Sequence, residues 1–339
     1  MSKKEIVYKV LEHKETSKIP YYLPVTPPAR KKLVEYFGTD DLHSALGLYI
    51  FMVSPKGKPL YASPNEYGPT ITDEFGVVWT TSDIDRGSPI GNPLKEPNLK
   101  NYSFPDPHNP SRYEGIKEKI EKHKNLFIVG VIGDLWERAA FLRGQQNLFM
   151  DVYLNQSFLE ELLERLTEYN SVTMDYLVKF GIDAIFLSDD YGTQKDLMIS
   201  PEHWRKFIKP RLKNLFEKAK SYGVKCMLHS DGNIEKIIPD LIEIGLDILH
   251  PIQPEVMDIF KLKREYGKYL TFEGGINTQN LLPYGSPEEV AKEVEKTIKI
   301  MSKGGGYILE PGINIQADVP LENILALVET VKNYNPIYS

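Results

Sequence analysis

Short apolar runs alternate with amphipathic stretches along the chain from Asn125 onward. Each run ends in a polar residue or glycine, and the stretch after it has the apolar spacing of a helix. Strands and helices that alternate in this way form βαβ units, so the pattern predicts an α/β fold with a parallel sheet. The predicted strands are residues 126–134, 184–190, 225–231, 247–253, 270–275 and 307–312.

An earlier apolar run, residues 19–25, precedes a helical stretch and supplies a first strand. An eighth strand is then expected between about residues 40 and 125. A doubly wound sheet usually carries a glycine-rich phosphate loop after an early strand, and this sequence has none. We therefore predict a distorted (β/α)8 TIM barrel that occupies residues 1–339 as a single domain.

Residues 50–112 interrupt the alternation and are dense in proline, glycine and tyrosine. We interpret them as a long insertion near the N-terminus, with a small hairpin in the segment TDEFGVVWTT. A loop of this length is typical of a lid over a functional site. The equally weighted alternative is a surface belt that closes the bottom of the barrel.

Composition and charge exclude several classes of partner. The formal net charge is -6, with acidic and basic residues mixed along the chain, whereas nucleic-acid binding requires a concentrated basic face. The N-terminus lacks the apolar core of a signal peptide, and no apolar run approaches the ~20 residues of a membrane span. The single cysteine, Cys226, excludes an internal disulfide and suits a reducing compartment, so a cytoplasmic location is expected.

Polar side chains follow the predicted strands at the end where barrel enzymes place their active sites. Because residues two apart in a strand share a face, His229 and Asp231 point the same way and can meet one ion or one substrate atom. Histidine combined with several carboxylates is the donor set of a zinc or similar divalent site. The polar residues at these ends are Asp134, Asp189, Asp190, His229, Asp231, His250, Gln253, Glu273 and Glu310.

Simpler interpretations compete at each position. Asp231 precedes Gly232 and a helical stretch, so capping that helix is as plausible as ligand binding. Asp189 and Asp190 are adjacent and face opposite sides, so at most one points into the site and the other caps or binds a backbone amide. Cys226 is expected to be a small buried apolar residue.

A second group of candidates lies just past the strand that ends at Asp134. Glu137 and Arg138 begin a helix there and could bind an anionic group or form a structural ion pair, whereas Arg143 is expected to be structural. Aromatic residues near the predicted mouth suit a flat ligand, although aromatic residues at strand ends also simply pack. These are Tyr21, Tyr22, Trp79, Trp136 and Tyr191.

Several long segments resemble the uroporphyrinogen decarboxylase superfamily, among them DEFGVVW, ERAAFLRG, FLSDDYG, LHSDGNI and TFEGGINTQNLLPYGS. The resemblance runs nearly end to end and implies a distorted (β/α)8 barrel. Decarboxylases of this group need no cofactor and hold their polycarboxylated substrate with an arginine-rich segment near the N-terminus. The corresponding stretch here, IPYYLPVTPPARKK, contains only Arg30, so the resemblance does not favour decarboxylation of uroporphyrinogen.

The other branch of the superfamily comprises methyltransferases that work with a corrinoid protein. Those similar to methylcobamide:coenzyme M methyltransferases bind zinc through a His-x-Cys pair and a later cysteine. The matching positions here are His229, Asp231 and Ile313, so both thiolates are replaced. The resemblance then implies an oxygen-rich metal site for zinc, made by His229, Asp231, Glu273 and Glu310.

Together these observations lead to the hypothesis of a corrinoid-dependent methyltransferase. It moves a methyl group from a small methylated compound, such as a methoxylated aromatic that is O-demethylated, to a corrinoid carried by a partner protein. His229, Asp231, Glu273 and Asp190 are expected to bind metal or protonate the leaving oxygen. A decarboxylase acting on a carboxylated substrate and a non-catalytic small-molecule binder are the alternatives. The expected substrate-binding residues are Tyr21, Tyr22, Trp79, Glu137, Arg138, Tyr191 and His250.

Overall fold

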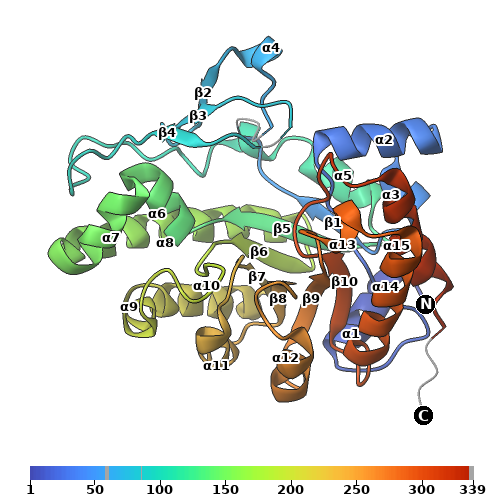
Figure 1. The fold of residues 1–339 in the computed structure, drawn as a ribbon. Coiled ribbons are helices and arrows are strands. Elements are labelled where there is room, and N and C mark those ends of the chain that lie inside the picture. Colours follow the sequence, from blue (N-terminus) through green and yellow to red (C-terminus); the bar gives the residue numbers. More distant parts are fainter. Residues whose placement is uncertain (58–60, 85, 336–339) are drawn as a thin grey trace.

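A curled seven-stranded parallel sheet forms the centre of the molecule (Figure 1). The structure is a computed structural model and describes residues 1–57, 61–84 and 86–335. Its order is β1-β5-β6-β7-β8-β9-β10, and every neighbouring pair is parallel. The six strands predicted after Asn125 are all confirmed. The strands are β1 Ile50–Val53, β5 Phe127–Gly133, β6 Ala184–Ser188, β7 Lys225–His229, β8 Ile248–Ile252, β9 Thr271–Ile276 and β10 Tyr307–Pro311.

The predicted strand at residues 19–25 is reduced to two isolated parallel bridges, Tyr21 with Leu309 and Val25 with Ile315. Pro20 and Pro24 lack the N–H group that a continuous ladder needs, which accounts for the interruption. The segment nevertheless contacts both edges of the sheet. The Tyr22 N–H donates to the Leu309 carbonyl at 3.0 Å, and the N–H of Tyr49, just before β1, donates to the Tyr21 carbonyl at 3.2 Å. The architecture is therefore TIM-barrel-like.

The extra strand expected between residues 40 and 125 is β1, which pairs with β5. It occupies the first four residues of the region interpreted as an insertion. The rest of that region holds a separate antiparallel sheet of β2 (Thr70–Thr72), β3 (Val78–Thr80) and β4 (Pro89–Gly91), and β2 with β3 forms the predicted hairpin. Residues 58–60 and 85 of the interpreted insertion lie outside the described residues.

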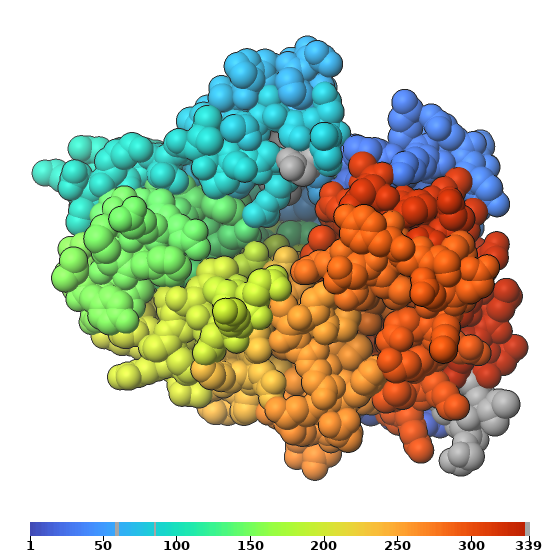
Figure 2. All heavy atoms as spheres, in the orientation of Figure 1, coloured from blue at the N-terminus to red at the C-terminus, as the bar shows by residue number. Residues whose placement is uncertain are grey.

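This small sheet lies over one side of the main sheet (Figure 1). In Figure 2 the surface is hollowed between this cyan segment and the orange and red C-terminal part of the chain. The segment that carries the small sheet and the C-terminal part of the chain thus flank this hollow.

Helices cover the outer face of the main sheet (Figure 1). The long helix α8 shows why: its residues Leu159, Leu162, Leu163 and Leu166 follow helical spacing and are buried, and the helix packs against β5. None of the described helices combines the length and apolar character needed to cross a membrane. The α-helices are α1 Lys3–Leu11, α2 Pro27–Phe37, α3 Leu42–Leu46, α4 Pro64–Tyr67, α5 Ile116–Lys122, α6 Trp136–Arg143, α7 Gln145–Leu154, α8 Gln156–Lys179, α9 Pro201–Phe207, α10 Lys209–Ser221, α11 Ile238–Glu243, α12 Ile259–Tyr266, α13 Leu281–Tyr284, α14 Pro287–Met301 and α15 Leu321–Asn333.

Candidate active site

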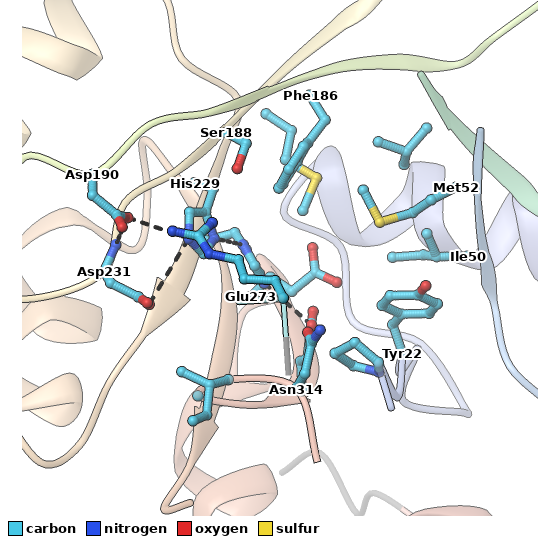
Figure 3. A pocket seen from close by; sticks show the side chains of 18 of the residues that line it. Tyr22, Ile50, Met52, Phe186, Ser188, Asp190, His229, Asp231, Glu273 and Asn314 are labelled. Carbon is cyan, nitrogen blue, oxygen red and sulfur yellow. Dashed lines mark hydrogen bonds and ion pairs between the residues drawn. The ribbon is translucent and has the colours of Figure 1, made fainter. Parts of the chain in front are cut away.

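A cavity of about 590 Å³ is lined by at least one side chain from every strand of the main sheet. Side chains alternate between the two faces of a strand, so residues two apart point into the cavity together. Phe186 with Ser188 and Met227 with His229 are examples. In Figure 3 Asp190, His229 and Asp231 gather on one side, Tyr22, Ile50 and Met52 lie on the other, and Glu273 lies between them. The lining is Tyr22, Pro24, Ile50, Met52, Tyr61, Arg86, Val129, Glu137, Phe186, Ser188, Asp190, Met227, His229, Asp231, His250, Glu273, Glu310, Gly312, Ile313, Asn314 and Gln316.

His229, at the end of β7, lies between two carboxylates. Its Nε2 atom is 3.3 Å from Asp190 Oδ1 and 3.9 Å from Asp231 Oδ1. Burial alone would lower the pKa of His229, but the two carboxylates outweigh burial and raise the pKa to about 9. When no cation occupies the group, His229 is therefore an imidazolium at neutral pH.

His250, the register partner of His229 on β8, continues the chain of polar contacts. The two Nδ1 atoms are 2.9 Å apart, and His250 Nε2 is 3.2 Å from Glu310 Oε1. Burial and the charge of His229 lower the pKa of His250 to about 4, so this ring is neutral. The contacts then assign its proton: His229 donates from Nδ1, and His250 carries hydrogen on Nε2 and donates to Glu310.

Glu273 on β9 and Glu310 on β10 form a buried carboxyl pair at the centre of the cavity. Burial and the charge of Glu310 raise the pKa of Glu273 well above its usual range, and burial raises the pKa of Glu310 to about 7. Glu273 is therefore protonated at neutral pH, in a side chain that lines the cavity beside Glu310.

The loops that carry the acidic residues cross with their backbones in contact. A Cβ atom on Gly232, whose φ is +81°, would lie 2.5 Å from the Gly192 carbonyl carbon. The crossing lets the Asp231 N–H donate to Asp190 Oδ1 at 2.9 Å. Gln253 fixes the second loop, because it accepts from the Gly232 N–H and donates to Asp231 Oδ1.

Asp231 consequently faces the cavity. The following turn of 3-10 helix, Glu235–Ile237, has Ile234 at its N-cap position, so Asp231 does not cap it. Asp189 is fully buried on the opposite side from Asp190. It accepts hydrogen bonds from the backbone N–H groups of Trp136 and Glu137 and from the Tyr191 hydroxyl. The adjacent aspartates therefore divide as expected, one toward the site and one toward backbone amides.

Four of the expected substrate-binding residues lie outside the lining of this cavity, because each is engaged with the surrounding protein. The Tyr21 hydroxyl donates to the Leu46 carbonyl, and Trp79 Nε1 donates to Asp73 at 3.0 Å. Arg138 pairs with Asp134 and Asp73, and the Tyr191 hydroxyl is bound to Asp189. The structure places the following residues outside the lining: Tyr21, Trp79, Arg138 and Tyr191.

The other expected residues do line the cavity. Tyr22 stands on the apolar side, and Glu137 pairs with Arg86 at 2.8 Å near the small sheet. Arg143 has the structural role expected, because it is buried and pairs with the buried Asp151 at 2.7 Å. The predicted site residues that line this cavity are Tyr22, Glu137, Asp190, His229, Asp231, His250, Glu273 and Glu310.

Sequence reasoning missed several lining residues. Phe186, Ser188 and Met227 could have been found from strand alternation. Ser188 and Met227 precede the candidates Asp190 and His229 by two residues, and Phe186 precedes Ser188 by two. Arg86 and Tyr61 could not, because they come from the irregular segment between β1 and η1 (Pro110–Tyr113), which has no periodic pattern. Asn314, whose amide donates to the Tyr61 hydroxyl, lies in the loop after β10.

One ligand atom each from Asp190, His229 and Asp231 lie within 4.8 Å of one another. An imidazole nitrogen and two carboxylate oxygens fit a divalent cation such as zinc. The group differs from the predicted set, because Asp190 joins it, while Glu273 and Glu310 pair with each other near His250. No thiolate is available: the only cysteine, Cys226, is buried, and its Sγ is 3.7 Å from the Phe216 carbonyl oxygen.

Comparisons with known proteins agree with this architecture. The chain is 25% identical over 252 residues to a uroporphyrinogen decarboxylase of Wigglesworthia glossinidia brevipalpis, covering 71% of this chain and 68% of the relative. It is 26% identical over 237 residues to the methylcobamide:CoM methyltransferase MtbA of Methanosarcina acetivorans, covering 70% and 67%.

The fold is shared with a solved methyltransferase from Methanosarcina mazei, at a TM-score of 0.76 and 21% sequence identity over 98% of both chains. Residues 71–334 match the family described as uroporphyrinogen decarboxylase (URO-D). The chain belongs to the uroporphyrinogen decarboxylase family.

Proposed function

We infer that this protein is an enzyme that transfers a methyl group from a small methylated donor to the corrinoid of a partner protein. The observation that carries this inference is the charge of the cavity. Five carboxyl side chains line it, Glu137, Asp190, Asp231, Glu273 and Glu310, against one arginine or lysine among the described lining residues. That cation, Arg86, is already paired with Glu137.

Such a cavity does not suit a polycarboxylated porphyrinogen. Its cations, Arg86 and the imidazolium of His229, are already paired with Glu137 and Asp190, so the substrate's carboxylates would meet the remaining acidic groups. A neutral donor fits better. The apolar wall of Ile50, Met52 and Phe186 suits the organic part of a methoxylated aromatic compound, with Tyr22 beside it (Figure 3). Similarity to a protein named methylcobamide:CoM methyltransferase supports a corrinoid as a participant in the methyl transfer.

In the proposed reaction, reduced cobalt supplies the electron pair that forms the new bond to the methyl carbon. The bond from that carbon to oxygen breaks, its electron pair stays on oxygen, and the oxygen takes up one proton. An alkoxide or phenoxide is a poor leaving group unless its charge is neutralised as it develops. Glu273 is the proposed proton donor, because its raised pKa keeps it protonated at neutral pH and its side chain lines the cavity.

His229 assists in one of two ways. Without a cation it is an imidazolium that stabilises negative charge in the cavity, and it passes its Nδ1 hydrogen bond to His250. Asp190, His229 and Asp231 would hold a zinc ion, which when bound supplies Lewis acidity toward the leaving oxygen. Asp190 and Asp231 then balance the positive charge at this side of the site in both cases.

The test is a mixing assay in which the protein, a corrinoid protein reduced to the cobalt(I) state and a panel of methylated donors are combined. Methyl transfer is followed through the absorption change of the cobalt, with Glu273→Gln as the matched inactive variant. A donor-dependent change that is lost in Glu273→Gln supports the proposal. Turnover of a porphyrinogen by the protein, with no spectral change for any methoxylated donor, would overturn it.

A further inference from the structure

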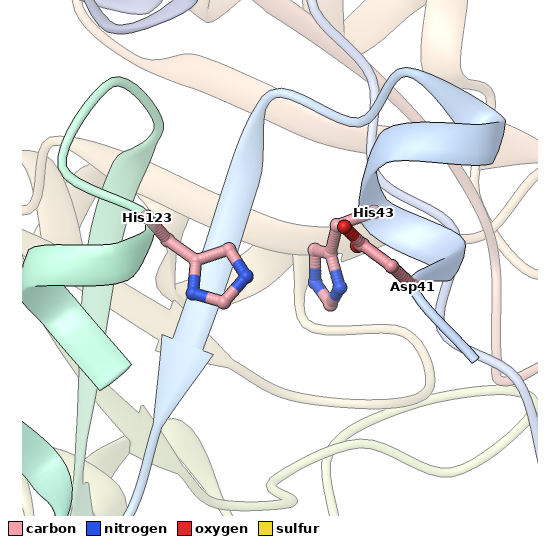
Figure 4. A group of neighbouring side chains, drawn as sticks. All are labelled: Asp41, His43 and His123. Atoms are coloured by element: carbon pink, nitrogen blue, oxygen red, sulfur yellow. The ribbon is translucent and has the colours of Figure 1, made fainter. Parts of the chain in front are cut away.

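A second cluster of potential ligands lies away from the main cavity. Asp41 caps α3, His43 lies within α3, and His123 caps the C-terminal end of α5 (Figure 4). One ligand atom of each residue lies within 4.8 Å of those of the other two. None of the three lines the cavity described above.

Phe51 of β1 fixes the position of the cluster. Its ring stacks on His123 with centroids 3.8 Å apart and contacts the edge of His43 at 4.9 Å. Ile50 and Met52, the neighbours of Phe51, line the main cavity. Because side chains alternate along a strand, Phe51 and both imidazoles lie on the outer face of the sheet, between α3 and α5.

The hydrogen bonds leave the imidazole nitrogens in the state that a metal ion requires. His123 Nδ1 is 2.9 Å from the Lys119 carbonyl oxygen, which can only accept, so Nδ1 carries the hydrogen and Nε2 keeps its lone pair. A backbone carbonyl that orients a histidine in this way is the usual support for a ligating imidazole. In Figure 4 a ring nitrogen of His123 and one of His43 face each other.

His43 provides the second observation. Its Nε2 atom is buried and has no hydrogen-bond partner among the residues that the structure describes. Plain stacking of two imidazoles on Phe51 would leave this polar atom unsatisfied, at a cost of about 1–3 kcal/mol. A cation coordinated by that nitrogen removes the deficit.

Asp41 supplies a carboxylate that is already held in place. Its Oδ1 accepts from the Ser44 N–H at 3.2 Å, and its Oδ2 accepts from the Ser44 hydroxyl at 2.7 Å. Each carboxylate oxygen keeps a further lone pair. Two imidazoles and one carboxylate form a common ligand set for divalent transition metals, with the remaining positions filled by water.

We propose that Asp41, His43 and His123 bind a divalent transition-metal ion of the zinc type, at a site separate from the main cavity. The ion fastens α3 to the end of α5 across Phe51 and thereby braces the outer face of β1. Its role is structural, because the ligands lie on the far side of β1 from the cavity. This inference does not depend on the proposed methyltransferase activity.

The test measures zinc bound per chain in the full-length His229→Gln protein, in which the cluster around Asp190 has lost its imidazole. Metal is removed with a chelator, zinc is added back, and the bound zinc is determined after dialysis, with circular dichroism as a check of folding. About one equivalent is expected, with a rise in melting temperature on zinc addition. No bound zinc in the folded His229→Gln protein would overturn the proposal.

Two further variants in the same background locate the ion. His43→Gln removes one ligand, and Asp41→Asn removes the carboxylate charge while keeping a residue that caps helices well. Each is expected to raise the zinc dissociation constant about tenfold or more and to abolish the thermal shift. His108→Gln, an exposed histidine, is the control and keeps the zinc. Unchanged binding in both ligand variants would place the zinc elsewhere and refute the site.

Discussion

The Nδ1 atoms of His229 and His250 lie 2.9 Å apart on neighbouring strands. Only one of the two nitrogens carries a hydrogen, so one proton serves both rings. The shared proton connects the acidic group around His229 to the carboxyl pair of Glu273 and Glu310. Charge at one side of the cavity is therefore coupled to protonation at the other.

Replacing His250 is expected to weaken the fold as well as the site. His250→Phe removes the donor to Glu310, whose carboxyl is buried, so the free energy of unfolding should fall by about 1–3 kcal/mol in urea titrations. His250→Gln can still donate an amide hydrogen to Glu310 and should lose less. Equal losses in the two variants would show that this hydrogen bond does not stabilise the protein.

Glu273→Gln should separate catalysis from stability. The variant keeps the shape of the side chain but has no acidic proton, so the methyl-transfer rate is expected to fall about 10²–10⁴-fold. Wild-type activity should likewise decline as pH rises through the raised pKa of Glu273. A rate within threefold of wild type, roughly, would remove Glu273 from the role of proton donor.

The same variant predicts the sign of a pH effect on stability. Because the pKa of buried Glu273 is raised above the usual 4.5, the unfolded chain loses this proton first, and wild-type stability falls as pH rises above 4.5. Glu273→Gln removes that loss. Its free energy of unfolding relative to wild type should therefore increase between about pH 4.5 and neutrality, as measured by urea titrations at a series of pH values.

Arg86→Gln tests the contribution of the irregular segment to ligand binding. Arg86 lines the cavity and pairs with Glu137, but its side chain is 46% exposed, so stability should change by less than about 1 kcal/mol. The Michaelis constant for the donor should rise up to about fivefold. Lys56→Gln, which breaks a pair with Glu114 away from the cavity, should leave it unchanged.

Gly232→Ala should disturb the crossing of the two acidic loops. Gly181→Ala is the matched control, because Gly181 also has a positive φ, +91°, but a Cβ atom there would meet nothing within 4 Å. Both variants bear the cost of left-handed backbone, about 1–2 kcal/mol. Gly232→Ala should lose about 2 kcal/mol more, because its Cβ would collide with backbone atoms. Similar melting temperatures for the two variants would contradict the close approach.

Cys226 should be inert in the folded protein. It is fully buried, and burial together with Asp247 raises the pKa of its thiol, so little thiolate forms at neutral pH. A chromogenic disulfide reagent should react with less than about one per cent of its rate toward the urea-unfolded chain. Because the chain has one cysteine, any rapid reaction in native buffer would be unambiguous evidence of exposure.

The repeating part of the fold was predictable because buried parallel strands are short apolar runs between helices. All six runs after Asn125 are strands. β1 was not located, since its four residues, IFMV, adjoin a proline- and glycine-rich segment and carry no alternation. Pro20 and Pro24 reduced the expected first strand to two bridges, because proline has no backbone N–H group to donate to a ladder.

The site was predictable where one local rule sufficed. Carboxyl-terminal strand positions and two-residue alternation brought His229, Asp231, Glu273 and Glu310 to one cavity. The rule did not reveal which carboxylates would meet, because that depends on how the loops cross. The cluster of Asp41, His43 and His123 was also out of reach, since its members come from elements whose packing no sequence period encodes.

The pairing of residues 19–25 with the edge of the sheet has a consequence for how the chain folds during synthesis. On one side, the backbone partners of this early segment are Leu309 and Ile315, which come far later in the sequence. On the ribosome, residues 19–25 emerge long before those partners exist, so the curled sheet stays open along this line until residues 309–315 have been synthesised. The cavity, which every strand of the main sheet helps to enclose, can then take its final shape only after β10 has been made.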